Sequence, residues 1–532
     1  MLDILIRNGW VADGTGNPVY PADIAIQGDK VVEVTRLPGA QAARVIDATG
    51  KIAAPGFIDA HSHSDWSIHA NPTGESTIRQ GVTTEIVGQC GLSSAPVTDA
   101  SRGMVTGRLR TYAYDGEVTW STFAEYLDAI AKMGTSYNLA YFVGHNTVRQ
   151  AAGVYGPEVA EDQLRTMESF VAEAIEAGAV GVSTGLEFEP GRVASAPEIQ
   201  RVVNVAGRYG ALYGSHIRNR AQFLEEAVDE YLDTAKKAGV RGEISHLNVR
   251  ENTGAKEGAW HRVVATIDRA RQDGLEVLAD TTPFLDGLGQ MQGILPPWLL
   301  NEGTAKAAEL LKDPDVRPRV KADCDRYWRF IYRGDWHRVS LHSSHEFPEL
   351  CGKSFPEIAD IMHKDPWDCF FDILAAAGPK MDSLILTATL LNERHSADMV
   401  SNPLFGLTVD GFTSRIDGPL AEASRHPICF AGMTHYLTHH VREMKTLTLE
   451  EAVRKMTSMP ANHHGFHDRG LLRPGFKADV QVFDFAALDD GSTVKYPLVY
   501  AKGVEHVLVN GVPVIAGGQH TGARPGRNLL RA

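Results

Sequence analysis

The sequence predicts an α/β protein built on a TIM-type (β/α)8 barrel, with a small β-sandwich made from both chain ends. Three observations lead to this fold class. Short β-rich runs with turn signals occupy both ends, strands alternate with helices over roughly 400 residues between them, and polar residues follow several of the strands. At 532 residues the chain is long enough for more than one domain.

The first 54 residues have the texture of a small antiparallel sheet. Short β-rich runs alternate with turn signals such as Asp13-Gly14-Thr15-Gly16. Similar short β-rich runs recur at residues 478–484 and 507–511. We therefore expect residues 1–54 and 470–532 to pair into one β-sandwich.

The pattern changes between these ends, over residues 55–469. Residues 83–87 and 179–183 resemble strands, whereas residues 168–177 and 221–238 have the composition and periodicity of helices. Repeated β–α units of this kind predict a parallel sheet closed into a barrel.

Composition restricts the class of protein. The chain is 43% hydrophobic and 22% charged, as globular proteins are. Its net charge of −14 lacks basic blocks and argues against a nucleic-acid partner. No apolar run reaches the length of about 18 residues that a membrane span needs. Residues 1–7 resemble a strand more than a signal peptide, and five scattered cysteines favour a reducing cytoplasm.

Potential metal ligands end five of the predicted strands. In chain order they are His61 and His63, Cys90, His216, His246 and Asp410. Catalytic residues of parallel barrels lie at the C-terminal ends of strands, and residues i and i+2 of a strand point to the same side. A thiolate, imidazoles and a carboxylate suit Zn²⁺. The pattern therefore predicts a catalytic zinc site, in which Asp410 would serve as general base.

Each of these residues also has a structural interpretation. Cys90 could be a buried structural thiol, since free cysteine is often a small core residue. His216 and His246 could each be core histidines with satisfied hydrogen bonds. Asp410 precedes Gly411, a common turn pair. Their joint occurrence at strand ends favours the metal site.

Ordered motifs along nearly the whole chain match a known family. They are Gly56–Asp65, Gln80–Thr84, Gly88–Val97, Val143–Arg149, Gly181–Leu186, Ser215–Arg218, Ile244–His246, Leu295–Trp298, Val409–Gly411 and Lys455–Val480. On these motifs the chain resembles the amidohydrolase superfamily and, within it, the D-aminoacylase or N-acyl-D-amino-acid deacylase family. The resemblance implies metal-dependent hydrolysis of a non-peptide carbon–nitrogen bond.

The resemblance also implies a role for each ligand. The tight zinc would be bound by Cys90, His216 and His246. A second, weaker metal would lie at His61 and His63. Many superfamily members bridge two metals with a carboxylated lysine, but residues 179–186 contain no lysine. Cys90 is then the natural anionic substitute.

Catalytic and substrate-binding roles follow in the same way. Asp410 would be both a metal ligand and the catalytic acid/base, and His145 would orient the substrate or stabilise the oxyanion. We expect an insertion at about residues 286–350 to cap the pocket. The candidates for binding a substrate carboxylate or its neighbouring groups are Arg149, Arg218, Arg250 and Asn248. Each of the three arginines could instead be a solvated or structural residue.

Two departures from the family pattern bear on the substrate. Leu247-Asn248 stands where His-Lys is usual, and the loop Glu187-Phe188-Glu189-Pro190 replaces a less acidic one. Losing a cation while gaining two acids argues against a strongly anionic substrate.

The sequence thus predicts a zinc-dependent amidohydrolase that cleaves the amide bond of N-acyl amino acids or related small N-acyl compounds. Its expected partner is that small molecule, and the oligomeric state stays open. Two alternatives remain. One is a cyclic amide hydrolase, like dihydroorotase or hydantoinase, or a deaminase on the same scaffold. The other is a non-catalytic scaffold protein.

Overall fold

The computed structural model describes residues 1–250, 253–300, 302–327, 331, 334–344, 346–424 and 426–531. At its centre lies an eight-stranded parallel sheet in the order β16-β12-β11-β10-β9-β8-β7-β6. Its strands are β6 (Phe57–Asp59), β7 (Val82–Val87), β8 (Asn138–Gly144), β9 (Gly181–Gly185), β10 (Leu212–His216), β11 (Arg241–Ile244), β12 (Val277–Thr281) and β16 (Phe405–Leu407). Just beyond the two edge strands, His63 N donates to Gly411 O (2.7 Å) and Asp410 N to His61 O (2.9 Å). These bonds close the sheet, and the predicted barrel is confirmed.

The barrel strands are buried on both faces. Every residue of β7 and β8 is buried, including the polar Glu85 and Asn138, so neither strand alternates between buried and exposed positions. Four outer helices follow successive strands: α6 (Glu161–Glu176), α7 (Ala196–Arg208), α8 (Leu224–Ala238) and α9 (Ala259–Gln272). Helix α8 has acids in its first turn and lysines in its last, which complement the helix dipole, and ends at Gly239 with φ 66°.

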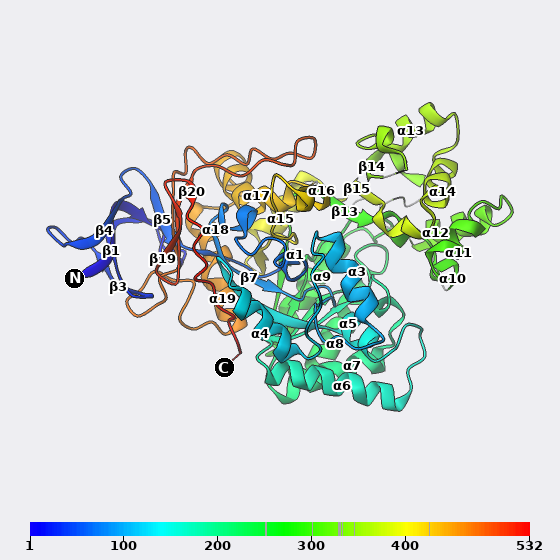
Figure 1. Cartoon of the computed structure of the whole chain (residues 1–532), viewed down its shortest axis with the longest axis horizontal. Coiled ribbons are helices and arrows are strands. Elements are labelled where there is room, and N and C mark those ends of the chain that lie inside the picture. The colour runs from blue at the N-terminus through cyan, green and yellow to red at the C-terminus, as the bar shows by residue number, and fades with distance from the viewer. Residues whose placement is uncertain are drawn as a thin grey trace.

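The two chain ends form one nine-stranded sheet (Figure 1). Its strands are β1 (Leu2–Val11), β2 (Tyr20–Gln27), β3 (Lys30–Thr35), β4 (Ala42–Asp47), β5 (Ile52–Pro55), β17 (Val480–Phe483), β18 (Val504–Val509), β19 (Val512–Ala516) and β20 (Gln519–His520). The junction is the antiparallel pair β5–β17, in which Ile52 faces Phe483. Ile24, Val480 and Leu508 share its hydrophobic core. The predicted pairing of the two ends is confirmed.

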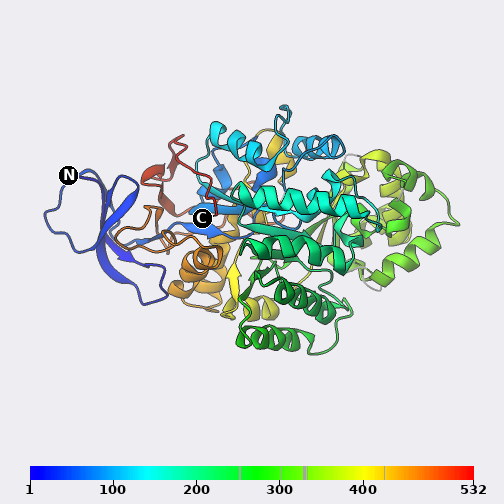
Figure 2. The same cartoon turned by 90° about the horizontal axis from the view of Figure 1, so that it is seen from below.

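A lobe with its own core lies at the other end of the barrel from this sheet (Figures 1 and 2). It is inserted between β12 and β16. Its elements are β13 (Asp286–Gln290), β14 (Val339–Ser343), β15 (Ile385–Thr389), α10 (Pro297–Leu300), α11 (Thr304–Leu310), α12 (Arg317–Tyr327), α13 (Phe355–Met362) and α14 (Pro366–Ala377). Because β15 is the central strand, paired with both β13 and β14, the lobe extends to Thr389, past the expected end near residue 350.

Shorter elements complete the chain. They are α1 (Ser64–Ser67), α2 (Glu75–Ile78), α3 (Arg102–Thr111), α4 (Phe123–Met133), α5 (His145–Ala151), α15 (Glu393–Ser401), α16 (Pro419–Ala423), α17 (Ile428–His435), α18 (Leu449–Met456) and α19 (Ser458–His464). Within the described part of the chain, no helix combines the length and apolarity needed to cross a bilayer.

Candidate metal centre and active site

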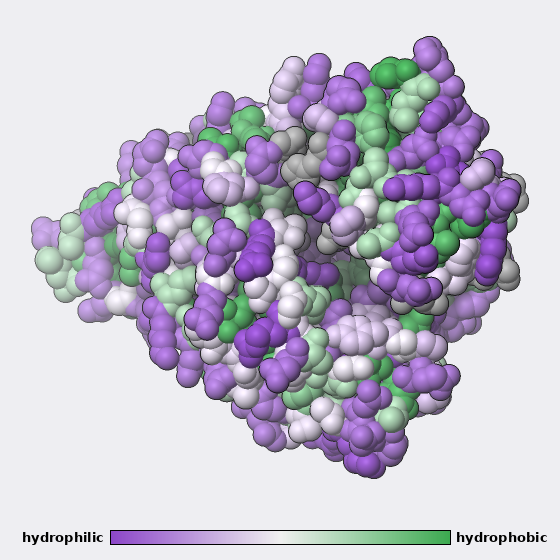
Figure 3. All heavy atoms as spheres, turned by 45° about the vertical axis from the view of Figure 1, so that its right-hand side comes forward, coloured by the Kyte–Doolittle hydropathy of each residue, from purple (hydrophilic) through white to green (hydrophobic). Residues whose placement is uncertain are grey.

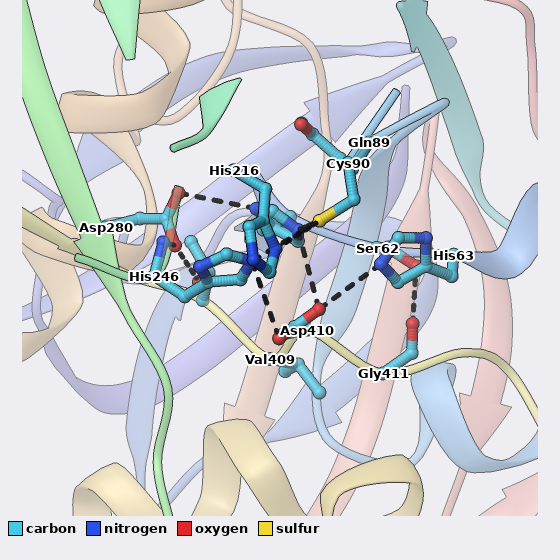
Figure 4. Close-up of polar contacts among 12 residues, drawn as sticks. Ser62, His63, Gln89, Cys90, His216, His246, Asp280, Val409, Asp410 and Gly411 are labelled. Atoms are coloured by element: carbon cyan, nitrogen blue, oxygen red, sulfur yellow. Dashed lines mark hydrogen bonds and ion pairs between the residues drawn. The ribbon is translucent and has the colours of Figure 1, made fainter. Parts of the chain in front are cut away.

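All six predicted ligands meet at the C-terminal end of the barrel. They are His61 and His63 after β6, Cys90 after β7, His216 at the end of β10, His246 after β11 and Asp410 after β16. In Figure 4, Cys90 and Asp410 lie between His63 on one side and His216 and His246 on the other, and the ligand atoms of His61 lie close to those of His63, Cys90 and Asp410. The structure therefore brings together residues that lie up to 349 positions apart, His61 and Asp410.

Cys90, His216 and His246 form the first of two groups able to hold a metal ion. Cys90 Sγ lies 3.5 Å from His216 Nδ1 and 3.3 Å from His246 Nε2. A tetrahedral zinc with ligands at about 2.3 Å for sulfur and about 2.0 Å for nitrogen separates them by roughly 3.5 Å. The spacing and the donor atoms both fit zinc.

His61, His63, Cys90 and Asp410 form the second group. His61 Nε2 lies 3.4 Å from Cys90 Sγ and 3.4 Å from Asp410 Oδ1, and His63 Nε2 lies 3.2 Å from the same oxygen. Cys90 belongs to both groups, so its sulfur can bridge two metal positions, as expected from the missing lysine.

The anionic ligands are held in their charged forms. Burial opposes ionisation of the Cys90 thiol, but the charges and hydrogen bonds of His61 and His216 lower its pKa well below the ordinary value. Burial also opposes ionisation of Asp410, and His61 and His63 again lower its pKa. Thiolate and carboxylate are the forms that bind a metal ion.

The backbone at three ligands is strained. Cys90, His246 and Asp410 have φ angles of 54°, 36° and 58°, which side-chain-bearing residues rarely adopt. Gly88 and Gly91 beside Cys90 are required by close approach, because a Cβ at Gly88 would lie 2.0 Å from a carbonyl oxygen of β8 and one at Gly91 2.6 Å from an amide nitrogen of β9. This tight packing holds the cysteine in its unfavourable conformation.

Asp280 on β12 is a site residue that the sequence analysis missed. Its Oδ1 accepts hydrogen bonds from His246 N (2.7 Å) and Thr408 Oγ1 (2.9 Å), and its Oδ2 lies 3.4 Å from His61 Nδ1. The fully buried carboxylate thus orients a ligand from each metal group. An acid inside the apolar strand Val277–Thr281 was the available signal.

His145 and Arg149 lie on α5 in a buried ion network. His145 Nε2 is 2.9 Å and Arg149 Nε 2.8 Å from Glu198 Oε1, with exposed side-chain fractions of 0%, 0% and 3%. Arg149 also donates to the carbonyls of Pro190 and Gly156. These contacts join α5 to α7 and to the loop after β9. The proposed substrate contact of each residue stays a prediction.

The other three substrate-binding candidates also have protein partners. Arg218 makes two 2.9 Å hydrogen bonds to Glu230, and Asn248 Nδ2 donates to His246 O (2.9 Å). Arg250 binds Glu187 through two hydrogen bonds of 2.9 and 2.8 Å. Glu187 Oε2 also lies 2.5 Å from His216 Nε2. Glu187 therefore connects the guanidinium of Arg250 to a metal ligand.

The acidic loop does not make this site as negative as its sequence suggests. Besides Arg250, Arg220 approaches Glu187 to 3.5 Å. Two buried guanidinium groups thus face one carboxylate, and Arg220 was not among the predicted residues. The composition of the loop alone is therefore no argument against an anionic substrate.

A cavity of about 870 Å³ opens beside this cluster. Arg250 and Trp260 from the β11–α9 segment line it together with Asp335 from the lobe and Arg394 from α15. In the space-filling view, the face turned forward is hollowed near its centre, and both hydrophilic and more hydrophobic residues lie around the hollow (Figure 3).

Comparison with known proteins supports the assignment suggested by this geometry. A deacylase of N-acyl-D-glutamate from Alcaligenes xylosoxydans xylosoxydans is 34% identical over 540 residues, covering 100% of this chain and 97% of that protein. A solved structure of N-acyl-D-glutamate deacylase from Bordetella bronchiseptica, complexed with zinc and a phosphonate mimic of the tetrahedral intermediate, matches with a TM-score of 0.80 and 30% identity, covering 100% of both chains. A crystal structure of D-aminoacylase matches with a TM-score of 0.82 and 27% identity over the same share of both chains.

A sequence profile of the amidohydrolase family matches residues 44–329 and 391–515. The gap between the two matched ranges falls in the inserted lobe, whereas every strand that carries a candidate ligand is included. The chain therefore belongs to the amidohydrolase family, as its motifs predicted, and is a metal-dependent hydrolase of non-peptide carbon–nitrogen bonds.

Proposed function

We propose that this protein is a zinc-dependent deacylase that hydrolyses the amide bond of N-acyl-D-amino acids. The observation that carries the proposal is the position of Cys90, whose sulfur lies within 3.5 Å of nitrogen atoms of His61, His216 and His246. The full-length similarity to deacylases of N-acyl-D-glutamate and to D-aminoacylase supports the substrate class and its stereochemistry.

Zinc bound by Cys90, His216 and His246 would supply a Lewis acid that polarises the amide carbonyl and promotes ionisation of water. Asp410 is the ligand-group side chain most open to an incoming molecule, with 28% of it exposed. Its lowered pKa keeps it a carboxylate. Asp410 can therefore accept a proton from the attacking water and pass it to the departing nitrogen.

The surroundings suit a small acidic substrate. The cavity of about 870 Å³ lies within the usual size of small-molecule sites, roughly 300 to 1,000 Å³. Arg220 and Arg250 place two positive charges against Glu187, which contacts the metal ligand His216, and Arg250 also lines this cavity. We infer that an acidic amino-acid side chain or its α-carboxylate is tolerated there, against the expectation from the loop sequence.

We also propose the reducing cytoplasm as the working compartment. None of the five cysteines, all of which lie in the described part of the chain, forms a disulfide, and four of them are buried. A free Cys90 thiolate is needed for metal binding, and an oxidising compartment would put it at risk.

An activity panel tests the function. The purified zinc-loaded chain is assayed with N-acetyl-D- and N-acetyl-L-forms of glutamate, aspartate, methionine and leucine, and with hydantoin and dihydroorotate. We expect release of the free amino acid from D substrates at a rate at least about 100-fold above that from L substrates. Hydrolysis of the cyclic amides with none of the N-acyl substrates would overturn the proposal.

Asp410→Asn tests the assigned base. Turnover of the variant should fall by more than about 1,000-fold, because the side-chain amide of the new asparagine cannot accept the proton of the attacking water as a general base does. Zinc bound by Cys90, His216 and His246 should remain, as measured by metal analysis. An active, zinc-loaded variant would show that another group is the base.

A further inference from the structure

Two side chains of opposite charge contact the outer nitrogens of the first metal group. Glu187 lies in the loop after β9 and binds His216. Arg220 follows β10 and binds His246. The exposed fractions of the Glu187 and Arg220 side chains are only 6% and 9%, so solvent screens these contacts weakly.

Glu187 favours a metal-binding form of His216. The distance from Glu187 Oε2 to His216 Nε2 is 2.5 Å. Because a carboxylate can only accept, the ring proton lies on Nε2, and the lone pair of Nδ1 points at Cys90 Sγ, 3.5 Å away. Arg250 holds both oxygens of Glu187 at 2.9 and 2.8 Å. This is the arrangement by which carboxylates orient histidine ligands of metals.

Arg220 favours the opposite form of His246. Its Nη1 lies 2.7 Å from His246 Nδ1 and 2.9 Å from His246 O. A guanidinium carries only donors, so Nδ1 must accept, and the proton of the neutral ring then lies on Nε2. That nitrogen is the one 3.3 Å from Cys90 Sγ, and a protonated nitrogen has no lone pair for a metal ion.

Two further features of Arg220 act in the same direction. Its Nη2 lies 3.3 Å from His216 Nε2, where it competes with the hydrogen bond to Glu187. Its charge is also buried beside the position of a cation, next to the like charge of Arg250. Arg220 Nε has no hydrogen-bond partner among the described residues, so one donor of its guanidinium group is unpaired there.

We propose that Glu187 and Arg220 are positioning residues that set the zinc affinity of the Cys90–His216–His246 group in opposite directions. Glu187 raises the affinity by fixing the metal-binding tautomer of His216, and Arg220 lowers it by competing for the lone pair of His246. The inference rests on the proposed zinc site. Arg220 thus makes the affinity of this group for zinc lower than it would be with Glu187 alone, by a margin that one substitution can reveal.

Zinc affinity measured against a competing chelator tests the proposal directly, without any assay of activity. Full-length Glu187→Gln should bind zinc about 10- to 100-fold more weakly than the unsubstituted chain, the usual effect of losing such a partner. Arg220→Met should bind it about 10-fold more tightly. Glu189→Gln and Arg192→Met, in the same loop, are the matched controls and should change the affinity by less than about twofold.

Cobalt provides a spectroscopic readout. The thiolate-to-cobalt charge-transfer band should appear at lower total cobalt in Arg220→Met and at higher total cobalt in Glu187→Gln. The double variant should lie between the single ones. If Arg220→Met does not fold, as judged by circular dichroism, Arg220→Gln takes its place, since it also removes the charge and the fork of donors.

The outcomes separate this proposal from the one on function. Cys90→Ser serves as the reference. If Cys90→Ser binds zinc as tightly as the unsubstituted chain, the zinc site itself is wrong. If Cys90→Ser loses zinc while Glu187→Gln and Arg220→Met match their controls, or both shift in the same direction, the opposed roles are wrong and the zinc site stands.

Discussion

The sulfur of Cys90 lies 3.4 Å from His61 Nε2, although His61 belongs to the metal group opposite His216 and His246. One thiolate therefore faces both metal positions. The left-handed backbone of Cys90, with φ 54°, directs the sulfur toward both positions. The neighbouring Gly88 and Gly91 leave no room for a larger residue. The two positions thus depend on each other through a single side chain.

Cys90→Ser should abolish tight metal binding at both positions. A serine hydroxyl is nearly isosteric but stays protonated, so the shared anionic ligand is lost. We expect zinc affinity to fall by more than about 100-fold, beyond the effect of losing an outer contact. Metal analysis after dialysis measures this. Cys429→Ser, at a buried thiol outside both groups, is the control, and equal zinc content in the two variants would contradict the prediction.

His63→Ala should separate the two positions. His63 belongs only to the second group, where its Nε2 lies 3.2 Å from Asp410 Oδ1. The first equivalent of zinc should bind as tightly as before, and the second should weaken by at least about 10-fold. A calorimetric titration of the metal-free chain resolves the two steps. Loss of the first, tight step would show that the assignment of tight and weak positions is reversed.

Glu198→Gln should destabilise the fold. Glu198 is the ion-pair partner of Arg149, whose side chain is fully buried, and it also binds His145. The substitution leaves a buried guanidinium without a counter-charge, which costs about 3 to 5 kcal/mol of the free energy of unfolding. Urea denaturation measures it. The exposed Glu189, replaced by Gln, should cost less than about 0.5 kcal/mol, and equal losses would contradict the buried ion network.

The strand-end ligands could be predicted because their position depends on local rules. A strand of alternating side chains places His61 and His63 on one side, and parallel strands of a barrel end at a common face. The role of Asp280 could not be read in the same way. Its contacts to His61 and His246 depend on which strands become neighbours across the closed barrel.

The surroundings of Glu187 and Arg220 could not be predicted from the sequence either. The sequence suggested an excess of acid in the loop after β9, but the fold sets Glu187 against two arginines from later loops. The lobe was also predicted too short. Its central strand, Ile385–Thr389, pairs with Asp286–Gln290 across a long stretch of sequence, and such pairing is decided by tertiary contacts more than by local propensity.

His395 should make stability pH-dependent. Its Nε2 accepts a hydrogen bond from Val249 N (3.0 Å), and its ring packs edge-on against Trp260 beside the cavity. Burial lowers the pKa of His395 to about 4, below the value of about 6.5 in an unfolded chain. Protonation then favours the unfolded state, so this contribution is complete above pH 6.5 and is lost as the pH falls toward 4.

The loss at pH 5 should be on the order of 1 to 2 kcal/mol. His395→Gln keeps an acceptor for Val249 N but cannot titrate, so its free energy of unfolding should fall less between pH 8 and pH 5 than that of the unsubstituted chain. Urea denaturation at both values measures the difference. His467→Gln, at an exposed position, controls for the general effect of acid. An identical pH dependence in all three proteins would mean that the buried imidazole of His395 does not govern this transition.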